Sequence, residues 1–79
     1  MNKTEVERDD LFTDAARLIV SQQKASSAML QLKLKLGYMR ANRIMNQLKE
    51  AKIISGSNDM NWKVSILSPV DLETHLNTL

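Results

Sequence analysis

Cysteine is absent from this 79-residue chain, which also contains only one histidine and two glycines. Without thiols there can be no disulfide, no thiolate nucleophile and no cysteine-ligated zinc. A single histidine, His75, leaves little material for a catalytic base or a metal site. Two glycines are too few for a dinucleotide-binding or Walker-type phosphate loop. We therefore expect that the chain is not an enzyme and that it needs no cofactor.

Long apolar runs are also absent. No stretch approaches the roughly 20 apolar residues that span a bilayer, and residues 1–10 lack the apolar core of a signal peptide. These absences predict a cytoplasmic chain that makes no contact with a membrane. Hydrophobic residues make up 43% and charged residues 25% of the chain. These are ordinary values for a globular fold, and the length suits one small domain.

Charge is distributed unevenly along the chain, although the net charge is only +2. Residues 1–23 carry three basic and five acidic side chains, residues 24–63 carry eight basic and two acidic ones, and residues 64–79 carry two acidic ones alone. From Lys24 to Lys49 there are six basic side chains and no acid. Such a stretch creates a field that attracts a polyanion, although it also suits a solvated basic surface.

Two helical patterns precede Gly37. Asp9 and Asp10 are plausible N-caps of a helix over about residues 10–22, where apolar side chains recur at helical spacing. Ser26 or Ser27 can cap a second helix over about 27–34. The alternating leucines at positions 30, 32, 34 and 36 favour a strand instead, but the serine caps favour the helix, which we predict. Gly37 then suits a turn with a positive φ.

A third helix is predicted over about residues 38–52. Its apolar residues Ala41, Ile44, Met45, Leu48 and Ala51 form one stripe, which we expect to be buried. The opposite face carries polar and basic side chains, and such a helix is a candidate for reading the major groove of DNA. On or beside this exposed face lie Met39, Arg40, Asn42, Arg43, Asn46 and Gln47.

After residue 52 the pattern changes to that of a hairpin. The β-branched pair Ile53-Ile54 and the alternating segment 62–67 flank the turn-rich residues 55–59, which predicts two antiparallel strands. Ser68 and Pro69 then suit the start of a last helix over about 69–78. Its leucines at positions 72, 76 and 79 are expected to line the inner face.

The predicted fold is therefore α+β and mostly helical. Its element order is that of a winged helix-turn-helix, with three helices, a β-hairpin wing and an extra C-terminal helix. We expect a flexible segment over residues 1–9 and one domain over residues 10–79. Tyr38 and Trp62 are more readily explained as packing residues than as stacking platforms, and His75 is expected at the surface without a role.

The residues of the second and third helices resemble one family. The entry Gln23-Lys24-Ala25-Ser26 and the core Gly37-Tyr38-Met39-Arg40-Ala41-Asn42-Arg43 resemble the gamma domain of FtsK/SpoIIIE DNA translocases. The preceding Asp-Asp-Leu-Phe at residues 9–12 and the Gly56-Ser57-Asn58 of the hairpin are similar to that family as well. The resemblance covers roughly residues 9–67.

The resemblance implies a winged helix that recognises short, G-rich, polar sequences in double-stranded DNA and thereby orients a translocase in chromosome segregation. It also implies docking on, and activation of, a Xer-type tyrosine recombinase. Arg40 and Arg43 match the arginines of the family's recognition helix. Arginine suits G-rich targets because its planar fork pairs with guanine O6 and N7, which contributes about 1–3 kcal/mol of discrimination.

This chain departs from the family pattern at several positions. Met39 stands where the family usually has asparagine, Asn42 where it has alanine, and Leu32 and Lys35 where it has arginines. The wing lacks the usual Pro-Arg, for which Lys63 supplies a nearby charge. The exact DNA target is therefore expected to differ. Lys33 and Lys35 suit phosphate contacts better than base contacts.

Two functions of different classes follow from these patterns. The first is a DNA-binding module whose contacts are the nine residues singled out above: Lys33, Lys35, Met39, Arg40, Asn42, Arg43, Asn46, Gln47 and Lys63. The alternative is a protein-interaction winged helix that docks a Xer-type recombinase. We expect the chain to be a monomer by itself, and we allow for several copies on one DNA.

Overall fold

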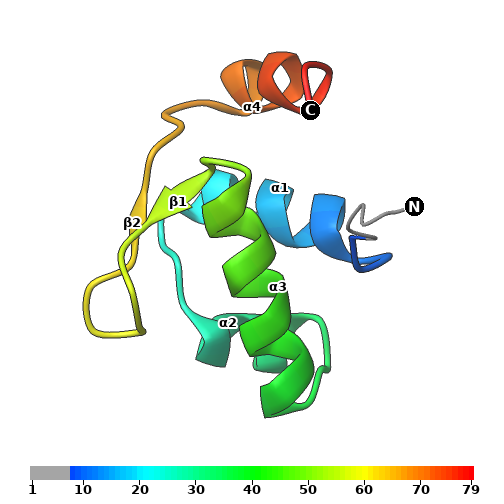
Figure 1. The fold of residues 1–79 in the computed structure, drawn as a ribbon, viewed down its shortest axis with the longest axis vertical. Coiled ribbons are helices and arrows are strands. Elements are labelled where there is room, and N and C mark those ends of the chain that lie inside the picture. The colour runs from blue at the N-terminus through cyan, green and yellow to red at the C-terminus, as the bar shows by residue number, and fades with distance from the viewer. Residues whose placement is uncertain (1–7) are drawn as a thin grey trace.

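Four helices and one β-hairpin make up the computed structural model, which describes residues 8–79 (Figure 1). The two strands pair antiparallel, with Ile54 opposite Val64 and Ser55 opposite Lys63. The predicted winged helix-turn-helix with an extra C-terminal helix is confirmed. In chain order the elements are α1 (Phe12–Gln22), α2 (Ser27–Lys33), α3 (Tyr38–Glu50), β1 (Ile54–Ser55), β2 (Lys63–Val64) and α4 (Pro69–Leu76).

The core forms where the apolar stripes of the helices meet the hairpin. The buried stripe predicted for α3 is confirmed, since its five apolar members are at most 3% exposed. The helix predicted for α2 is also confirmed, and the strand suggested by its alternating leucines is wrong. Leu30 is fully buried whereas Leu32 is 73% exposed, as a helix requires of residues about 200° apart. The apolar faces of the helices and the hairpin together enclose a core whose largest side chains are Ile19, Leu30, Ile44, Met45, Leu48, Ile53, Ile54 and Leu72.

The turn between α2 and α3 differs from the prediction. Gly37 has a φ of −75° and serves as the extended N-cap residue of α3, so the expected positive φ at this glycine is wrong. The left-handed residue is Lys35, with a φ of 58°. Because Leu36 N–H donates to Gln31 O at 3.1 Å, the end of α2 is closed by a Schellman-type turn that places its left-handed residue at Lys35.

The wing is a short ladder with a long, internally bonded loop. Strand pairing stops at Val64, short of the predicted end at residue 67, and one further bond joins Ser65 N–H to Ile53 O at 2.9 Å. Within the loop, Asn61 Oδ1 accepts hydrogen bonds from the backbone N–H groups of Ser57 at 2.8 Å and Asn58 at 3.1 Å. The loop is therefore held by its own polar groups.

Gly56 is the glycine on which this loop depends. Its φ is +120°, and a Cβ at this position would lie 2.5 Å from the backbone oxygen of Asn61. We expect Gly56→Ala to lower the free energy of unfolding by about 1–3 kcal/mol because both the dihedral angle and the contact become strained. Urea unfolding measures the change. Gly37→Ala is the matched control, since nothing lies within 4 Å of its added Cβ, and a similar loss in both variants would contradict the prediction.

Helix α4 begins as predicted and packs on α1. Ser68 Oγ accepts a hydrogen bond from Asp71 N–H at 3.1 Å, which confirms the serine cap. Leu72 is fully buried and Leu76 packs against the core, but Leu79 is 48% exposed, so its predicted inward position is wrong. Leu79 lies beyond the last turn of the helix, where the inner face no longer continues.

Two polar contacts fasten α4 to the rest of the domain. Arg17 of α1 forms a two-pronged ion pair with Glu73, with N···O distances of 2.9 and 3.1 Å. His75 Nε2 donates to the backbone oxygen of Ala51 at the end of α3, at 2.6 Å. The expected surface position of His75 is therefore wrong, because the ring is half-buried against this carbonyl.

The expected flexible segment falls mainly on residues 1–7, which lie outside the described residues. Arg8 lies over the Phe12 ring, 4.9 Å from its centroid, and Asp9 makes several hydrogen bonds. The boundary at residue 10 stays a prediction. No helix within residues 8–79 has the length and apolar character needed to cross a membrane.

Candidate nucleic-acid interface

Helix α3 runs along the long axis of the domain, with its first turn at the end away from α4 (Figure 1). Successive residues on a helix are about 100° apart, so their order around the axis follows from the sequence. Outside the buried stripe, this order divides the surface of α3 into three parallel zones. The zone facing the wing contains Tyr38, Asn42 and Asn46, the central zone contains Met39, Arg43 and, at the end of the helix, Glu50, and the far zone contains Gln47 and Arg40.

The central zone is open to solvent. Met39 is 74% exposed, and Arg43 and Asn46 are exposed beside it. Arg43 forms no ion pair with any residue in the range 8–79. No acid among the described residues therefore occupies the donors of its guanidinium.

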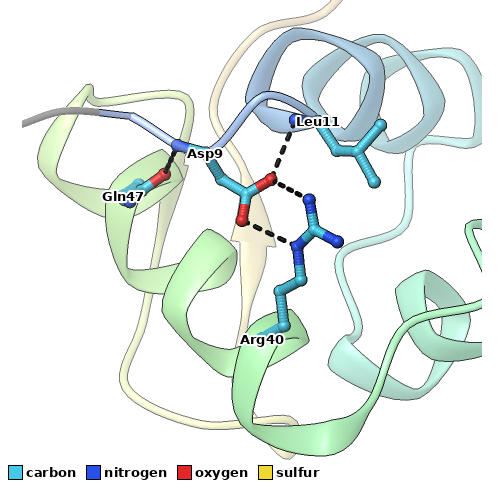
Figure 2. A network of polar contacts seen from close by, with 4 residues as sticks. All are labelled: Asp9, Leu11, Arg40 and Gln47. Atoms are coloured by element: carbon cyan, nitrogen blue, oxygen red, sulfur yellow. Dashed lines mark hydrogen bonds and ion pairs between the residues drawn. The ribbon is translucent and has the colours of Figure 1, made fainter.

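The far zone is partly covered by the start of the chain. Arg40 donates from Nε to Asp9 Oδ2 and from Nη2 to Asp9 Oδ1, both at 2.8 Å (Figure 2). Gln47 Oε1 accepts from the backbone N–H of Asp9 at 3.0 Å. Gln47 is only 9% exposed, so its expected place on the exposed face is wrong. Its amide oxygen satisfies the backbone of the N-terminal segment.

The carboxylate of Asp9 also supports the start of α1. Its Oδ1 accepts from the N–H of Leu11 at 2.9 Å, but the N-cap position is Leu11 and the helix begins at Phe12, two residues after the predicted start at residue 10. The hydrogen bonds from Arg40 are the main reason that the pKa of Asp9 falls from 3.8 to about 2; partial burial acts in the opposite direction. Asp9 is therefore ionised at neutral pH.

This low pKa predicts an acid-dependent loss of stability. Because the pKa of Asp9 is lower in the folded than in the unfolded state, its ionised form stabilises the fold above the unfolded pKa near 3.8. That contribution disappears as the pH falls through about 2. The urea midpoint of the wild type should fall more steeply between about pH 4 and pH 2 than that of Asp9→Asn. Parallel pH profiles for the two proteins would contradict the prediction.

On the wing side, α3 and the loop enclose a groove with a volume of about 420 Å³. Tyr38, Asn42 and Asn46 line it from α3, and Asn58, Met60 and Trp62 are among the residues that line it from the wing. Tyr38 is 61% exposed, so its expected packing position is wrong, whereas Trp62 packs against the core as predicted. Met60 is 93% exposed at the tip of the loop.

Asp59 fixes the wing to the start of α2. Its carboxylate accepts from Ser27 N–H at 3.0 Å, from Ser27 Oγ at 2.6 Å and from Trp62 Nε1 at 3.0 Å. Partial burial tends to raise the pKa of Asp59, but these hydrogen bonds outweigh it and leave the pKa below its ordinary value. The wing is therefore held beside α3 by an ionised carboxylate, which itself lines part of the groove.

The predicted lysines are all exposed. Lys33 ends α2, Lys35 is the left-handed residue of the following turn, and Lys63 lies on β2 opposite Ser55. The turn places Lys33 and Lys35 close in sequence to the first residues of α3, while Lys63 belongs to the wing. The site therefore has cationic side chains on two of the elements that flank α3.

Sequence reasoning missed Asp9 and Asp59. Both are acids near a surface expected to be basic, and both are separated from their partners by more than 30 residues along the chain. Nothing in local periodicity signals such pairs. Each acid stands in a segment rich in turn-forming polar residues, but such segments are too common to indicate which distant residue the acid will contact.

Comparison with known proteins supports one relationship. Residues 6–65 match the sequence model of the family described as the FtsK gamma domain. The DNA translocase FtsK of Chlorobaculum tepidum is 41% identical over 73 residues, which cover 91% of this chain and 9% of that protein. The DNA translocase FtsK of Clostridium tetani is 38% identical over 66 residues, covering 84% and 9% respectively.

A third relative, the DNA translocase FtsK of Caldanaerobacter subterraneus, is 48% identical over 50 residues, or 63% of this chain and 7% of that protein. The chain thus spans less than a tenth of the length of these relatives. The family match extends over α1, α2, α3 and both wing strands, and ends before α4. By this match and by its winged-helix fold, the chain belongs to the FtsK gamma domain family.

Proposed function

We propose that this domain binds double-stranded DNA sequence-specifically, with α3 in the major groove. The observation that carries the proposal is the central zone of α3, where Arg43 is exposed and unpaired within the described residues, next to Met39 and Asn46. An α-helix fits the width of the major groove, and its exposed side chains then face the base edges. Over the first turns of α3 this row holds uncharged and cationic groups, and the one acid on the same face, Glu50, lies at the last residue of the helix, about two turns beyond Arg43.

The chemistry of these side chains favours a G-rich target. The fork of Arg43 can donate two parallel hydrogen bonds to guanine O6 and N7. Asn46 and Asn42 can pair with adenine, and the thioether of Met39 can contact a thymine methyl group. These groups support recognition of a short, polar, G-rich motif, through which the domain orients a DNA translocase in chromosome segregation.

The lysines are proposed as phosphate contacts. Lys33 and Lys35 lie at the end of α2 and in the turn before α3, and Lys63 lies on the wing. Exposed ammonium groups on elements that flank a recognition helix suit the two backbone strands that border the major groove. Each such contact releases counterions, so binding weakens as salt rises. Arg40 is proposed as a further contact, through the part of its guanidinium that Asp9 does not use.

Fluorescence anisotropy tests this proposal directly. The protein is titrated into a labelled duplex that carries a G-rich polar octamer and into a shuffled duplex, each at two salt concentrations. Tighter binding to the first duplex, with an affinity that falls as salt rises, is the expected result. Equal and salt-sensitive binding would mean that the target has changed, and selection from random DNA would identify it. Absence of binding to both duplexes would contradict the proposal.

A second candidate function is docking of a Xer-type tyrosine recombinase. Leu67 and Val70, which lie between β2 and the first turn of α4, are 79% and 75% exposed. Two large apolar side chains so close in sequence suit a protein contact better than a DNA contact. Recombinase binding should persist after Arg40 and Arg43 are neutralised, and should weaken in a Leu67→Ser, Val70→Ser variant. The opposite pattern would assign the contact to α3.

A further inference from the structure

Asp9 is a carboxylate at the edge of the proposed DNA-binding surface. Its side chain is only 9% exposed, and its two oxygens accept three hydrogen bonds, two from Arg40 and one from Leu11 N–H. Figure 2 shows the carboxylate between the start of α1 and the first turns of α3. A carboxylate in this place repels the phosphates of DNA, so Asp9 can favour DNA binding only through the residues that it contacts.

The neighbour that it controls is Arg40. A guanidinium has five N–H donors in a rigid plane, and Asp9 occupies one edge of that plane, formed by Nε and one hydrogen of Nη2. The opposite edge, formed by Nη1 and the second hydrogen of Nη2, makes no hydrogen bond to any residue that the structure describes. The Arg40 side chain remains 45% exposed. The two-pronged contact therefore fixes the direction in which the unused edge points.

Asp9 is itself held firmly enough to act as a support. Its N–H donates to Gln47 Oε1 at 3.0 Å, and its backbone oxygen accepts from Phe12 N–H at 2.9 Å. The first contact joins it to α3 and the second to α1. Gln47 lies two helical turns after Arg40, so Asp9 bridges two points on the same side of the recognition helix.

From this geometry we infer that Asp9 is a positioning residue for DNA recognition, which holds Arg40 so that its free edge faces the DNA. The inference rests on the proposed function and adds to it a residue that determines specificity without touching a base. A free arginine samples many rotamers and contacts any phosphate nearby, whereas a fixed fork accepts only a partner in one place. Sequence preference is therefore expected to depend on Asp9.

A role of Asp9 through its charge and a role in positioning Arg40 predict different effects of replacing Asp9 by asparagine. If the carboxylate acts only through its charge, Asp9→Asn removes repulsion and strengthens binding to every duplex alike. If it positions Arg40, the ratio of affinities for preferred and scrambled DNA falls. Asp10→Asn is the matched control, because Asp10 is an exposed acid one residue further on that makes no hydrogen bond to Arg40.

The experiment uses a duplex enriched by the wild-type protein from random DNA and a scrambled duplex of the same composition. Anisotropy titrations give the ratio of the two affinities for the wild type, Asp9→Asn and Asp10→Asn. We expect the ratio to fall about threefold or more in Asp9→Asn, as for coupled residues in direct contact, and to stay unchanged in Asp10→Asn. Equal ratios in the two variants would overturn the inference while leaving DNA binding intact.

A second variant keeps the test decisive if Asp9→Asn folds poorly. Arg40→Lys keeps the charge but lacks the fork, so we expect a similar loss of preference with little change in the salt dependence of binding. Adding Asp9→Asn to Arg40→Lys should then lower the ratio no further. An unchanged preference in Arg40→Lys would overturn the inference. If the wild type enriches no sequence, the inference falls together with the proposed sequence recognition.

Discussion

Replacing Leu72 by alanine is expected to lower the free energy of unfolding by about 2–5 kcal/mol, the range for a leucine deleted from a packed core. Leu72 is the one residue of α4 that is fully buried. Its side chain joins the core that also includes α1 and the end of α3, and alanine would leave a cavity there. Urea unfolding followed by circular dichroism measures the loss.

Val70→Ala is the matched control, because Val70 lies on the same helix but is 75% exposed. Its effect should stay within about 0.5 kcal/mol. Comparing the two variants tests whether α4, which lies beyond residue 65 where the family match ends, belongs to the folded domain. A large effect only at Leu72 would make α4 part of the cooperative unit. Similar small effects in both variants would show that α4 is dispensable for stability.

Replacing Arg43 by alanine is expected to weaken binding to the preferred duplex by about 1–3 kcal/mol, or roughly 5- to 150-fold. Arg43 lies at the centre of the exposed surface of α3 and forms no ion pair within residues 8–79. Its loss therefore removes DNA contacts without leaving a described partner unpaired. Anisotropy titrations against preferred and scrambled duplexes at two salt concentrations measure the change.

The same titrations separate two roles for Arg43. A base contact predicts that the preference for the specific duplex falls, whereas a phosphate contact predicts equal weakening on both duplexes and a smaller salt dependence. Arg17→Ala removes the same charge from α1, where Arg17 pairs with Glu73, and should leave specific binding nearly unchanged. Equal losses in both variants would indicate that only net charge matters. An unchanged affinity in Arg43→Ala would count against the proposed interface.

Local patterns predicted the elements of this fold because each element is set by its own residues. The apolar stripe of α3 repeats at the helical period, and Ser68 caps α4 within one turn of its start. Two glycines behaved differently from each other. Gly56 has the positive φ of a tight loop, whereas the positive φ expected at Gly37 occurs at Lys35. The positive φ falls on Lys35 because α2 ends at Lys33, and the Schellman-type turn that closes it has its left-handed residue two positions later.

The candidate site was only partly predictable. The exposure of Met39 and Arg43 follows from their position opposite the buried stripe, and is confirmed. The helical periodicity does not predict the burial of Gln47, because this residue lies at the edge of the buried stripe. It is buried because the segment around Asp9 packs on it. Arg40 shares that edge. Its ion pair with Asp9 spans 31 residues, a separation at which no local pattern carries information.

The sequence by itself determined the fold class, the order of the elements and the outward position of Met39 and Arg43 on α3, because periodicity, capping and charge act over a few residues. The tertiary structure alone decided which charges remain available to a ligand. Asp9 takes one edge of Arg40, and Asp59 fastens the wing to α2, while Arg43 keeps its donors free of any described acid. These differences arise because a charge is neutralised by whatever the fold brings within a few ångströms of it, and chain distance does not report that proximity.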